Sequence, residues 1–256
     1  MKLTKVTDLN TPELQIYQQM RENAFSVDNS FVADSPKVVN LILQSDIVVN
    51  SVLATSEYYE EFAHLLSDVA TLYVAEKKLM EQLVGHKIHH NCMLHGVRPK
   101  ATPLSELDDH IIMLDEITST ENIGSIARSS AGVGVGSYLL PSRAPHPYSR
   151  RALRVSMGYV SKLKYHVYDD IYTTIKTLQS SGYKVYGAEL SENSIPLYDV
   201  KVAQKWVVLM GHEGKGLSKE VQEACDEIVS IEMSESVKSF NVAVASAIIM
   251  HRFKNV

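Results

Sequence analysis

A glycine-rich loop at residues 211–218 is the first part of this sequence that could do chemistry. It reads Gly-His-Glu-Gly-Lys-Gly-Leu-Ser and lies between an apolar, strand-like run at 206–210 and a helical segment that Ser218 can cap. Glycines at the end of a strand let the backbone approach a ligand closely, because they carry no Cβ. A tight turn without a ligand has the same composition. The loop also lacks the Gly-Lys-Ser/Thr ending of a phosphate loop.

Two further segments have polar residues at the start of predicted helices. Asn122, Gly124 and Arg128 follow an apolar run, and the spacing of four puts Gly124 and Arg128 on one helical face, which leaves space beside the guanidinium. Ser239 and Asn241 precede the last predicted helix, where Asn241 can act as the N-cap. Taken singly, the two asparagines could be ordinary caps and Arg128 a surface ion-pair residue.

In their order and spacing these segments resemble the three motifs of the SpoU, or TrmH, family of trefoil-knotted RNA methyltransferases. The first motif, Asn-x-Gly-x-x-x-Arg, is matched by Asn122, Gly124 and Arg128. The second, Gly-x-Glu-Gly-x-Gly, is matched by Gly211, Glu213, Gly214 and Gly216. The third, Ser-Leu-Asn-Val-x-Val-Ala, is matched by Ser239, Phe240, Asn241, Val242, Val244 and Ala245. A chance match of all three is improbable, although each alone is weak.

The resemblance is strong from about residue 108 to 256 and looser before it. Arg154, Ser156 and Gly158 are similar to a further Arg-x-Ser-x-Gly stretch of the family, and residues 31–39 look like its appended RNA-binding domain. The family implies a C-terminal knotted α/β domain, a homodimer through that domain, and S-adenosylmethionine as the methyl donor for ribose 2′-hydroxyl groups. It implies a catalytic set of Asn122, Arg128, Glu213, Ser239 and Asn241, and cofactor contacts from Leu190, Gly211, Gly216, Ile231, Met233 and Phe240.

The chemistry of this set limits what each residue can do. A sulfonium is a strong methyl donor without a metal, so the protein must orient the ribose hydroxyl. The family assigns activation of that hydroxyl to the residue that matches Arg128, yet an arginine stays protonated at ordinary pH. We therefore expect Arg128 to hold a phosphate or the developing alkoxide. We expect RNA backbone contacts from Arg150, Arg151 and Arg154, and a second footprint in the basic stretch 77–100.

Several residues depart from the family pattern and leave an alternative open. The third motif has Glu232 and Glu235 where the family usually has Pro and Gly, and Ser119-Thr120 replaces Asp-Pro before the first motif. A net charge of −5 also disfavours phosphate binding. The alternative is a catalytically degenerate relative that acts as an RNA-binding or scaffold protein. An N-terminal domain of about 100 residues favours ribosomal RNA as the substrate, with transfer RNA possible.

The pattern of apolar runs predicts an α/β fold in two domains, 1–102 and 103–256, divided by the proline-containing linker 98–105. In the first we expect a small α/β domain, with helical stretches at 13–25 and 37–43 and strands at 46–53 and 71–74. In the second, a mostly parallel sheet covered by helices on both faces is expected. Its strands are predicted at 110–114, 134–140, 164–168, 183–189, 206–210 and 227–231, and its helices at 123–131, 149–157, 170–181, 218–225 and 242–253.

Other features exclude competing functions. The glycines of residues 132–136 precede a strand and do not follow one, which argues against a Rossmann fingerprint. Cys92 and Cys225 are far apart and suit free thiols, and the histidines of residues 86–95 have no recognised metal-ligand spacing. No apolar run approaches the roughly 18 residues of a membrane span, and no signal-type region follows the start. We expect a cytoplasmic protein without a metal or a membrane anchor.

Overall fold

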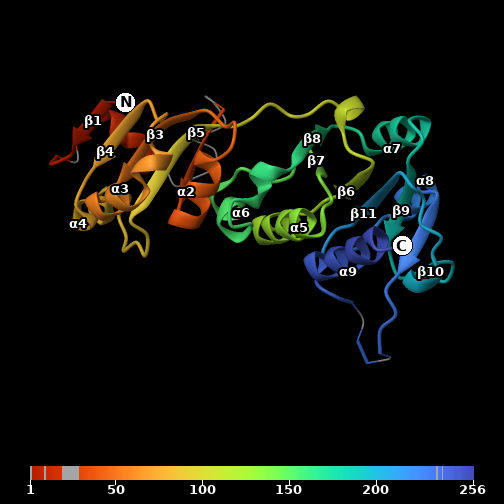
Figure 1. Ribbon diagram of the computed structural model, residues 1–256. Coiled ribbons are helices and arrows are strands. Elements are labelled where there is room, and N and C mark those ends of the chain that lie inside the picture. The colour runs from red at the N-terminus through yellow and green to blue at the C-terminus, as the bar shows by residue number, and fades with distance from the viewer. Residues whose placement is uncertain (1, 9, 19–28, 235, 238) are drawn as a thin grey trace. The chain divides into compact units, whose positions relative to one another are not determined.

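The computed structural model describes residues 2–8, 10–18, 29–234, 236–237 and 239–256. The chain forms two compact units (Figure 1). The first contains residues up to Lys100 together with Pro147–Ser161, and the second contains Ala101–His146 and Lys162–Val256. The first crossing between the units lies close to the predicted boundary at 102, whereas residues 147–161, which that prediction assigns to the second domain, cluster with the first unit.

The first unit is a five-stranded mixed sheet with helices. The strands are β1 (Lys2–Lys5), β2 (Ser30–Asp34), β3 (Val49–Ala54), β4 (Thr71–Val74) and β5 (Cys92–Val97), in the order β1-β4-β3-β5-β2. β1 and β3 pair in parallel with β4, and β5 runs antiparallel to β3 and β2. The helices are α1 (Gln15–Gln18), α2 (Pro36–Leu43), α3 (Ser56–Phe62), α4 (Lys77–Val84) and α6 (Arg150–Val155). Of the helix predicted at 13–25, residues 19–25 lie outside the described part of the chain.

The second unit is a seven-stranded sheet, and the strands that the structure describes in it all pair in parallel. The strands are β6 (His110–Leu114), β7 (Ser137–Pro141), β8 (Lys164–Tyr168), β9 (Lys184–Ala188), β10 (Ile195–Pro196), β11 (Trp206–Met210) and β12 (Glu227–Ser230). Their order is β10-β12-β9-β11-β6-β7-β8. The helices are α5 (Thr120–Val133), α7 (Ile171–Ser180), α8 (Lys219–Ala224) and α9 (Val242–Lys254). The predicted parallel α/β architecture is confirmed, and the two-residue β10 was not predicted.

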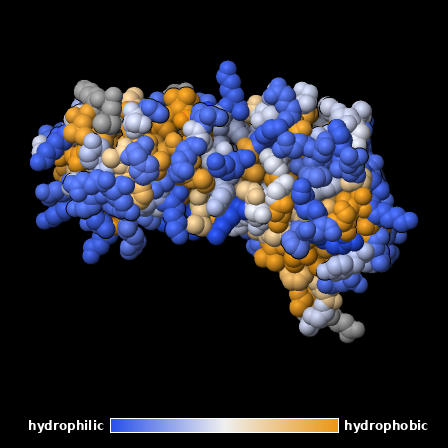
Figure 2. All heavy atoms as spheres, viewed as in Figure 1, coloured by the Kyte–Doolittle hydropathy of each residue, from blue (hydrophilic) through white to orange (hydrophobic). Residues whose placement is uncertain are grey.

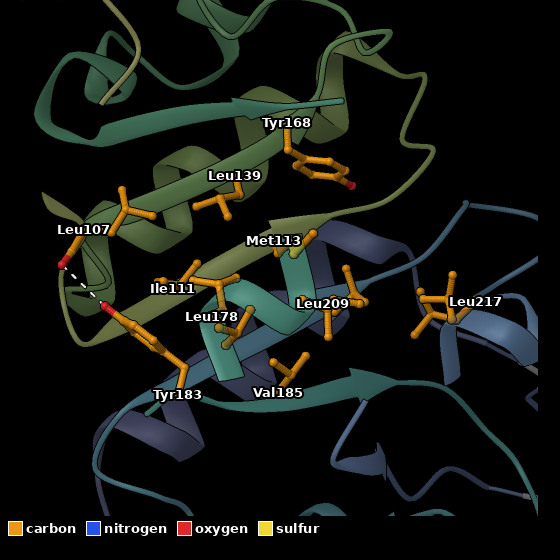
Figure 3. Close-up of a cluster of buried hydrophobic side chains, with 13 residues drawn as sticks. Leu107, Ile111, Met113, Leu139, Tyr168, Leu178, Tyr183, Val185, Leu209 and Leu217 are labelled. Carbon is orange, nitrogen blue, oxygen red and sulfur yellow. Dashed lines mark hydrogen bonds between the residues drawn. The ribbon is translucent and has the colours of Figure 1, made fainter. Parts of the chain in front are cut away.

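Apolar side chains alternate between the two faces of this sheet, because successive residues of a strand point to opposite sides. Ile111 and Met113 of β6 pack with α7 and α8 in a cluster drawn in Figure 3, in which the Tyr183 hydroxyl donates to the Leu107 carbonyl. On the other face the Tyr138 hydroxyl donates to the Ile123 carbonyl of α5, 2.9 Å away. α5 and α9 pack together on this face (Figure 1). Both faces are therefore covered, which leaves the strand ends as the place for a ligand.

Two strands begin three residues later than predicted: β3 at Val49 and β7 at Ser137. The strand expected at 134–140 begins only at Ser137, because Gly134 has φ of +78° and ends α5 in the left-handed conformation. Its backbone N–H donates to the carbonyl of Ala131 as a helix C-terminal bond. The glycine run at 132–136 thus ends a helix and connects it to β7, which agrees with the rejection of a dinucleotide fingerprint.

The segment 147–161 packs closely within the first unit. The Tyr148 ring lies 5.4 Å from the Phe31 ring, and a Cβ on Gly158 would come within 3.3 Å of the Val38 Cα. Gly158 also has φ of +84°, a conformation that favours glycine. This part of the sequence therefore folds against strand β2 and helix α2, more than 100 residues earlier in the chain. Among the described residues, no helix is long and apolar enough to cross a membrane.

Candidate functional site

A cavity of about 390 Å³ opens at the carboxyl ends of β9, β11 and β12, beside α9, within the second unit. All six predicted cofactor residues line it: Leu190, Gly211, Gly216, Ile231, Met233 and Phe240. Of the predicted catalytic residues, Glu213 and Ser239 line it as well. The cavity has the size of a small-molecule site, which typically measures about 300–1,000 Å³.

The loop after β11 closes on itself and forms one wall of the cavity. The His212 N–H donates to the Gly216 carbonyl at 3.2 Å, and the Gly216 N–H donates to the His212 carbonyl at 2.9 Å. A Cβ on Gly211 would lie only 2.5 Å from the Gly216 carbonyl carbon, and Gly216 itself has φ of +66°. Glycine is thus required at both positions by close approach and by backbone conformation, independently of any ligand.

Glu189 braces this loop from the neighbouring strand, a role that the sequence interpretation missed. One of its oxygens, Oε2, accepts the Leu217 N–H at 2.7 Å, and the other, Oε1, accepts the Leu190 N–H at 3.1 Å. Its carboxylate occupies the space where a side chain at Gly216 would lie. The sequence does contain a sign of this role: Glu189 is the polar last residue of the predicted strand 183–189, which ends at the same sheet edge as the glycine loop.

Three predicted catalytic residues from three distant segments form one hydrogen-bonded chain. Asn122 Nδ2 donates to Glu213 Oε1 at 3.1 Å, and Asn241 Nδ2 donates to Asn122 Oδ1 at 3.1 Å. The Asn241 side chain also accepts the Ala243 N–H at 2.9 Å and so caps α9, as predicted. Asn122 is not the cap of α5; Ser119 occupies that position and accepts the Asn122 N–H.

Glu213 is held as a carboxylate at the centre of this chain. Partial burial raises its pKa, but hydrogen bonds from the Asn122 side chain and from backbone N–H groups outweigh the burial, so the pKa is lowered overall. The Ser119 N–H donates to Oε1 at 3.2 Å, and the Thr118 N–H lies 3.5 Å from Oε2. An acceptor with this many donors orients its neighbours and is a weak base.

Arg128 stands apart from the other four residues of the predicted catalytic set. It lies on α5 with an exposed side chain and does not line the cavity. No hydrogen bond or ion pair joins its guanidinium to any residue that the structure describes. Glu232 is exposed and also lies outside the lining, and Glu235 is outside the described residues.

Arg150 and Arg154, which are predicted RNA contacts, pair with Asp34 within the first unit. Asp34 at the end of β2 is 2% exposed and accepts Arg150 Nε at 2.7 Å, while Arg154 Nε lies 3.5 Å from its other oxygen. His90 lies in the same cluster, where burial lowers its pKa and Asp34 opposes that shift. These arginines fix α6 to the sheet, and Arg151 beside them is exposed.

The described residues contain no group of three or more His, Cys, Asp or Glu side chains placed to hold a metal ion. Cys92 and Cys225 are both free thiols, and burial is the main cause that raises the pKa of each, to about 12 for Cys225. Neither cysteine lines the cavity.

Comparisons with known proteins agree with this geometry. Among curated relatives, the chain is 32% identical over 140 residues to an uncharacterized tRNA/rRNA methyltransferase of Mycolicibacterium paratuberculosis, covering 55% of this chain and 45% of the relative. It is 29% identical over 141 residues to a putative TrmH family tRNA/rRNA methyltransferase of Staphylococcus saprophyticus, covering 55% and 56%. The chain thus spans about half the length of these two relatives. It is also 28% identical over 195 residues to a 23S rRNA (guanosine-2′-O-)-methyltransferase, RlmB, of a Burkholderia species, covering 73% and 78%.

A solved structure with a similar fold covers nearly the whole chain. An AdoMet-bound rRNA methyltransferase from Sinorhizobium meliloti superposes with a TM-score of 0.86 at 19% identity, over 98% of this chain and 97% of that one. The sequence profile of the SpoU rRNA Methylase family matches residues 109–251. This matched region contains the glycine loop and the Glu213–Asn122–Asn241 chain, and the protein therefore belongs to the SpoU rRNA methylase family.

Proposed function

We propose that this protein transfers a methyl group from S-adenosylmethionine to a ribose 2′-hydroxyl of structured RNA, with ribosomal RNA favoured over transfer RNA. The observation that carries the proposal is the cavity whose walls contain all six predicted cofactor residues and which borders the Glu213–Asn122–Asn241 chain. The activities for which the relatives are named, one of them 23S rRNA guanosine-2′-O-methylation, support the reaction and the substrate class.

The residues present fit this cofactor. Gly211 and Gly216 bring backbone N–H and carbonyl groups to the cavity wall, and Leu190, Met233 and Phe240 supply apolar contacts suited to a purine ring. When bound, the cofactor supplies an electrophilic methyl group on a sulfonium, so no metal is required. The acidic Glu189 and Glu213 side chains in the wall suit a ligand with a cationic centre.

The polar chain orients groups near the cavity. Asn122 uses one amide hydrogen on Glu213 and its oxygen on Asn241, which leaves its second amide hydrogen for a nucleotide. Asn241 likewise retains one amide hydrogen, and Ser239 contributes a hydroxyl at the cavity wall. Arg128, exposed and unpaired among the described residues, is available to hold a phosphate or the developing alkoxide of the ribose.

We further propose that the first unit binds RNA, that the second unit carries the family's knot, and that it forms a homodimer. Arg151, whose side chain is exposed, and the basic stretch 77–100 are the candidate RNA contacts, together with Arg150 and Arg154, which also pair with Asp34. For the dimer, Figure 2 shows hydrophobic side chains gathered around the start of α9. Val237, Phe240 and Val244 are 45%, 41% and 47% exposed there, more apolar exposure than an isolated domain needs.

Isothermal titration with S-adenosylmethionine, followed by methyl transfer to unmodified ribosomal RNA, tests the proposal. Wild type should bind in the micromolar range, and Asn241→Ala should weaken binding by about 1–3 kcal/mol, because it removes both the cap and the bond to Asn122. Asn10→Ala, an exposed asparagine of the first unit, is the matched control. Nucleoside mass spectrometry should find the methyl group on ribose.

The alternative, a catalytically degenerate relative that acts as an RNA-binding or scaffold protein, would give a different result. In that case the wild type would not bind the cofactor, and replacement of Glu232 and Glu235 by the family's Pro and Gly would restore binding. Base methylation in place of ribose methylation would refute the proposed position of transfer while leaving the cofactor site intact.

A further inference from the structure

We propose that His212 is a positioning residue that holds the glycine loop in its ligand-binding shape only while its imidazole is neutral, so that cofactor affinity falls on acidification. The inference rests on the proposed function of the same cavity and concerns a side chain outside the matched motif positions. His212 occupies the variable position of the Gly-x-Glu-Gly-x-Gly motif, between Gly211 and Glu213.

The geometry determines which ring nitrogen carries the proton. His212 Nδ1 lies 2.9 Å from the Gly214 nitrogen and 3.2 Å from the Lys215 nitrogen, and both of these are backbone N–H donors. A nitrogen that accepts two N–H groups must have a free lone pair, so the neutral ring carries its proton on Nε2. These two bonds cross the turn at Gly214 and Lys215, which line the cavity.

Protonation of the ring removes this acceptor. The imidazolium has N–H groups at both nitrogens, and Nδ1–H would then point at two backbone donors. The turn must open or rotate to avoid this contact, and the cavity wall made by residues 211–216 moves with it. Histidine is the side chain whose charge ordinarily changes between about pH 5 and 8.

Charged groups of both signs lie around His212. The carboxylate of Asp115, after β6, interacts electrostatically with His212, and Arg143 lies 3.7 Å from Asp115. Burial and the nearby Glu116 raise the pKa of Asp115, so this carboxyl can itself take up a proton on acidification. The remaining charged groups at this wall are Glu189, Glu213 and Lys215. A test must therefore separate His212 from these neighbours.

Asparagine at position 212 provides that separation. Its side-chain oxygen can accept the N–H groups two and three residues further on, in the manner of an Asx turn, but it has no proton to gain. His212→Asn keeps the loop bonds and every neighbouring charge while it removes the titration. His212→Ala removes the acceptor at every pH.

The experiment is calorimetric titration of the 256-residue chain and both variants with S-adenosylhomocysteine and S-adenosylmethionine at about pH 7.5 and 5.5. Wild type should bind about tenfold more weakly at the lower pH, which corresponds to the loss of two neutral hydrogen bonds. The affinity should fall by no more than tenfold per pH unit, because a single proton is taken up. His212→Asn should change by less than about twofold. His212→Ala should be about tenfold weaker than wild type at pH 7.5, with little further change.

Fluorescence of Trp206, the single tryptophan, verifies that each protein is folded at both pH values. The inference is overturned if His212→Asn loses affinity on acidification as wild type does, if wild type shows no pH dependence, or if His212→Ala binds normally at pH 7.5. Failure of wild type to bind either ligand at pH 7.5 would instead overturn the proposed function, and with it this role for His212.

Discussion

Replacement of Asp34 by alanine should destabilise the first unit far more than an ordinary surface substitution. The carboxylate is 2% exposed and faces two arginines, Arg150 and Arg154, whose side chains are 21% and 43% exposed. Removal of one partner from a buried pair typically costs about 3–5 kcal/mol, because the other charge is left uncompensated. Here the arginines can partly reach water, so we expect the lower end, about 3 kcal/mol.

Hydrogen exchange measured by mass spectrometry can localise this loss. A change of 3 kcal/mol corresponds to roughly 150-fold faster exchange in segments that open with the unit, which are β2, β5 and α6. The strand β11 in the second unit should keep its protection and serves as an internal reference. Asp68→Ala, at an exposed aspartate of the same unit, is the matched control. Acceleration below about fivefold in all three segments would refute the claim that Asp34 anchors α6.

Three other predictions concern the two proposed sites. Gly216→Ala should abolish cofactor binding in calorimetry, because its φ of +66° is strained for alanine and the new Cβ would overlap Glu189. Gly85→Ala is the control: this residue has φ of +75° but lies in open space, so the substitution should lower the free energy of unfolding in urea by only about 1–2 kcal/mol. The pKa of Glu213 is lowered in the folded protein, so its carboxylate form stabilises the fold. The wild type should therefore have a higher free energy of unfolding than Glu213→Gln above the ordinary pKa of about 4.3, and the difference should disappear as the pH falls through the lowered pKa. A difference that does not depend on pH would contradict this. Arg151→Ala should weaken RNA binding and reduce the slope of log affinity against log salt by about 1, and an unchanged slope would exclude a phosphate contact.

The central strands β6 and β11 of the second unit could be predicted from sequence because they are buried on both faces. Strands β6, β8 and β11 have the predicted bounds. Buried apolar residues make up β11 and all of β6 after His110, whereas β8 (Lys-Tyr-His-Val-Tyr) is only partly buried. The failure at β7 has a different cause. Gly134, Val135 and Gly136 continue an apolar pattern, but the left-handed turn at Gly134 removes them from the strand.

The sequence predicted most residues that the structure brings together around the cavity, Arg128 excepted, but not the hydrogen bonds that connect them. Spacing within a motif places Asn122 on a helix and Glu213 on a loop, yet the bond between them joins positions 91 residues apart. Such contacts depend on the strand order, which places β11 beside β6. The same limit explains why Arg150 and Arg154 were interpreted as free RNA contacts, because their partner Asp34 lies more than 100 residues earlier.

The hydrogen-bond pattern also bears on how the proposed methyl transfer could handle the ribose proton. Glu213 is a weak base, because donors on its oxygens lower its pKa. The lone pair of His212 Nδ1 is used by two backbone N–H groups, and Nε2 then carries a proton. These two side chains are therefore suited to shaping the site and poorly suited to removing a proton. Stabilisation of the developing alkoxide by the exposed Arg128 guanidinium is then the stronger contribution open to the protein, and it needs no change in the charge of that arginine.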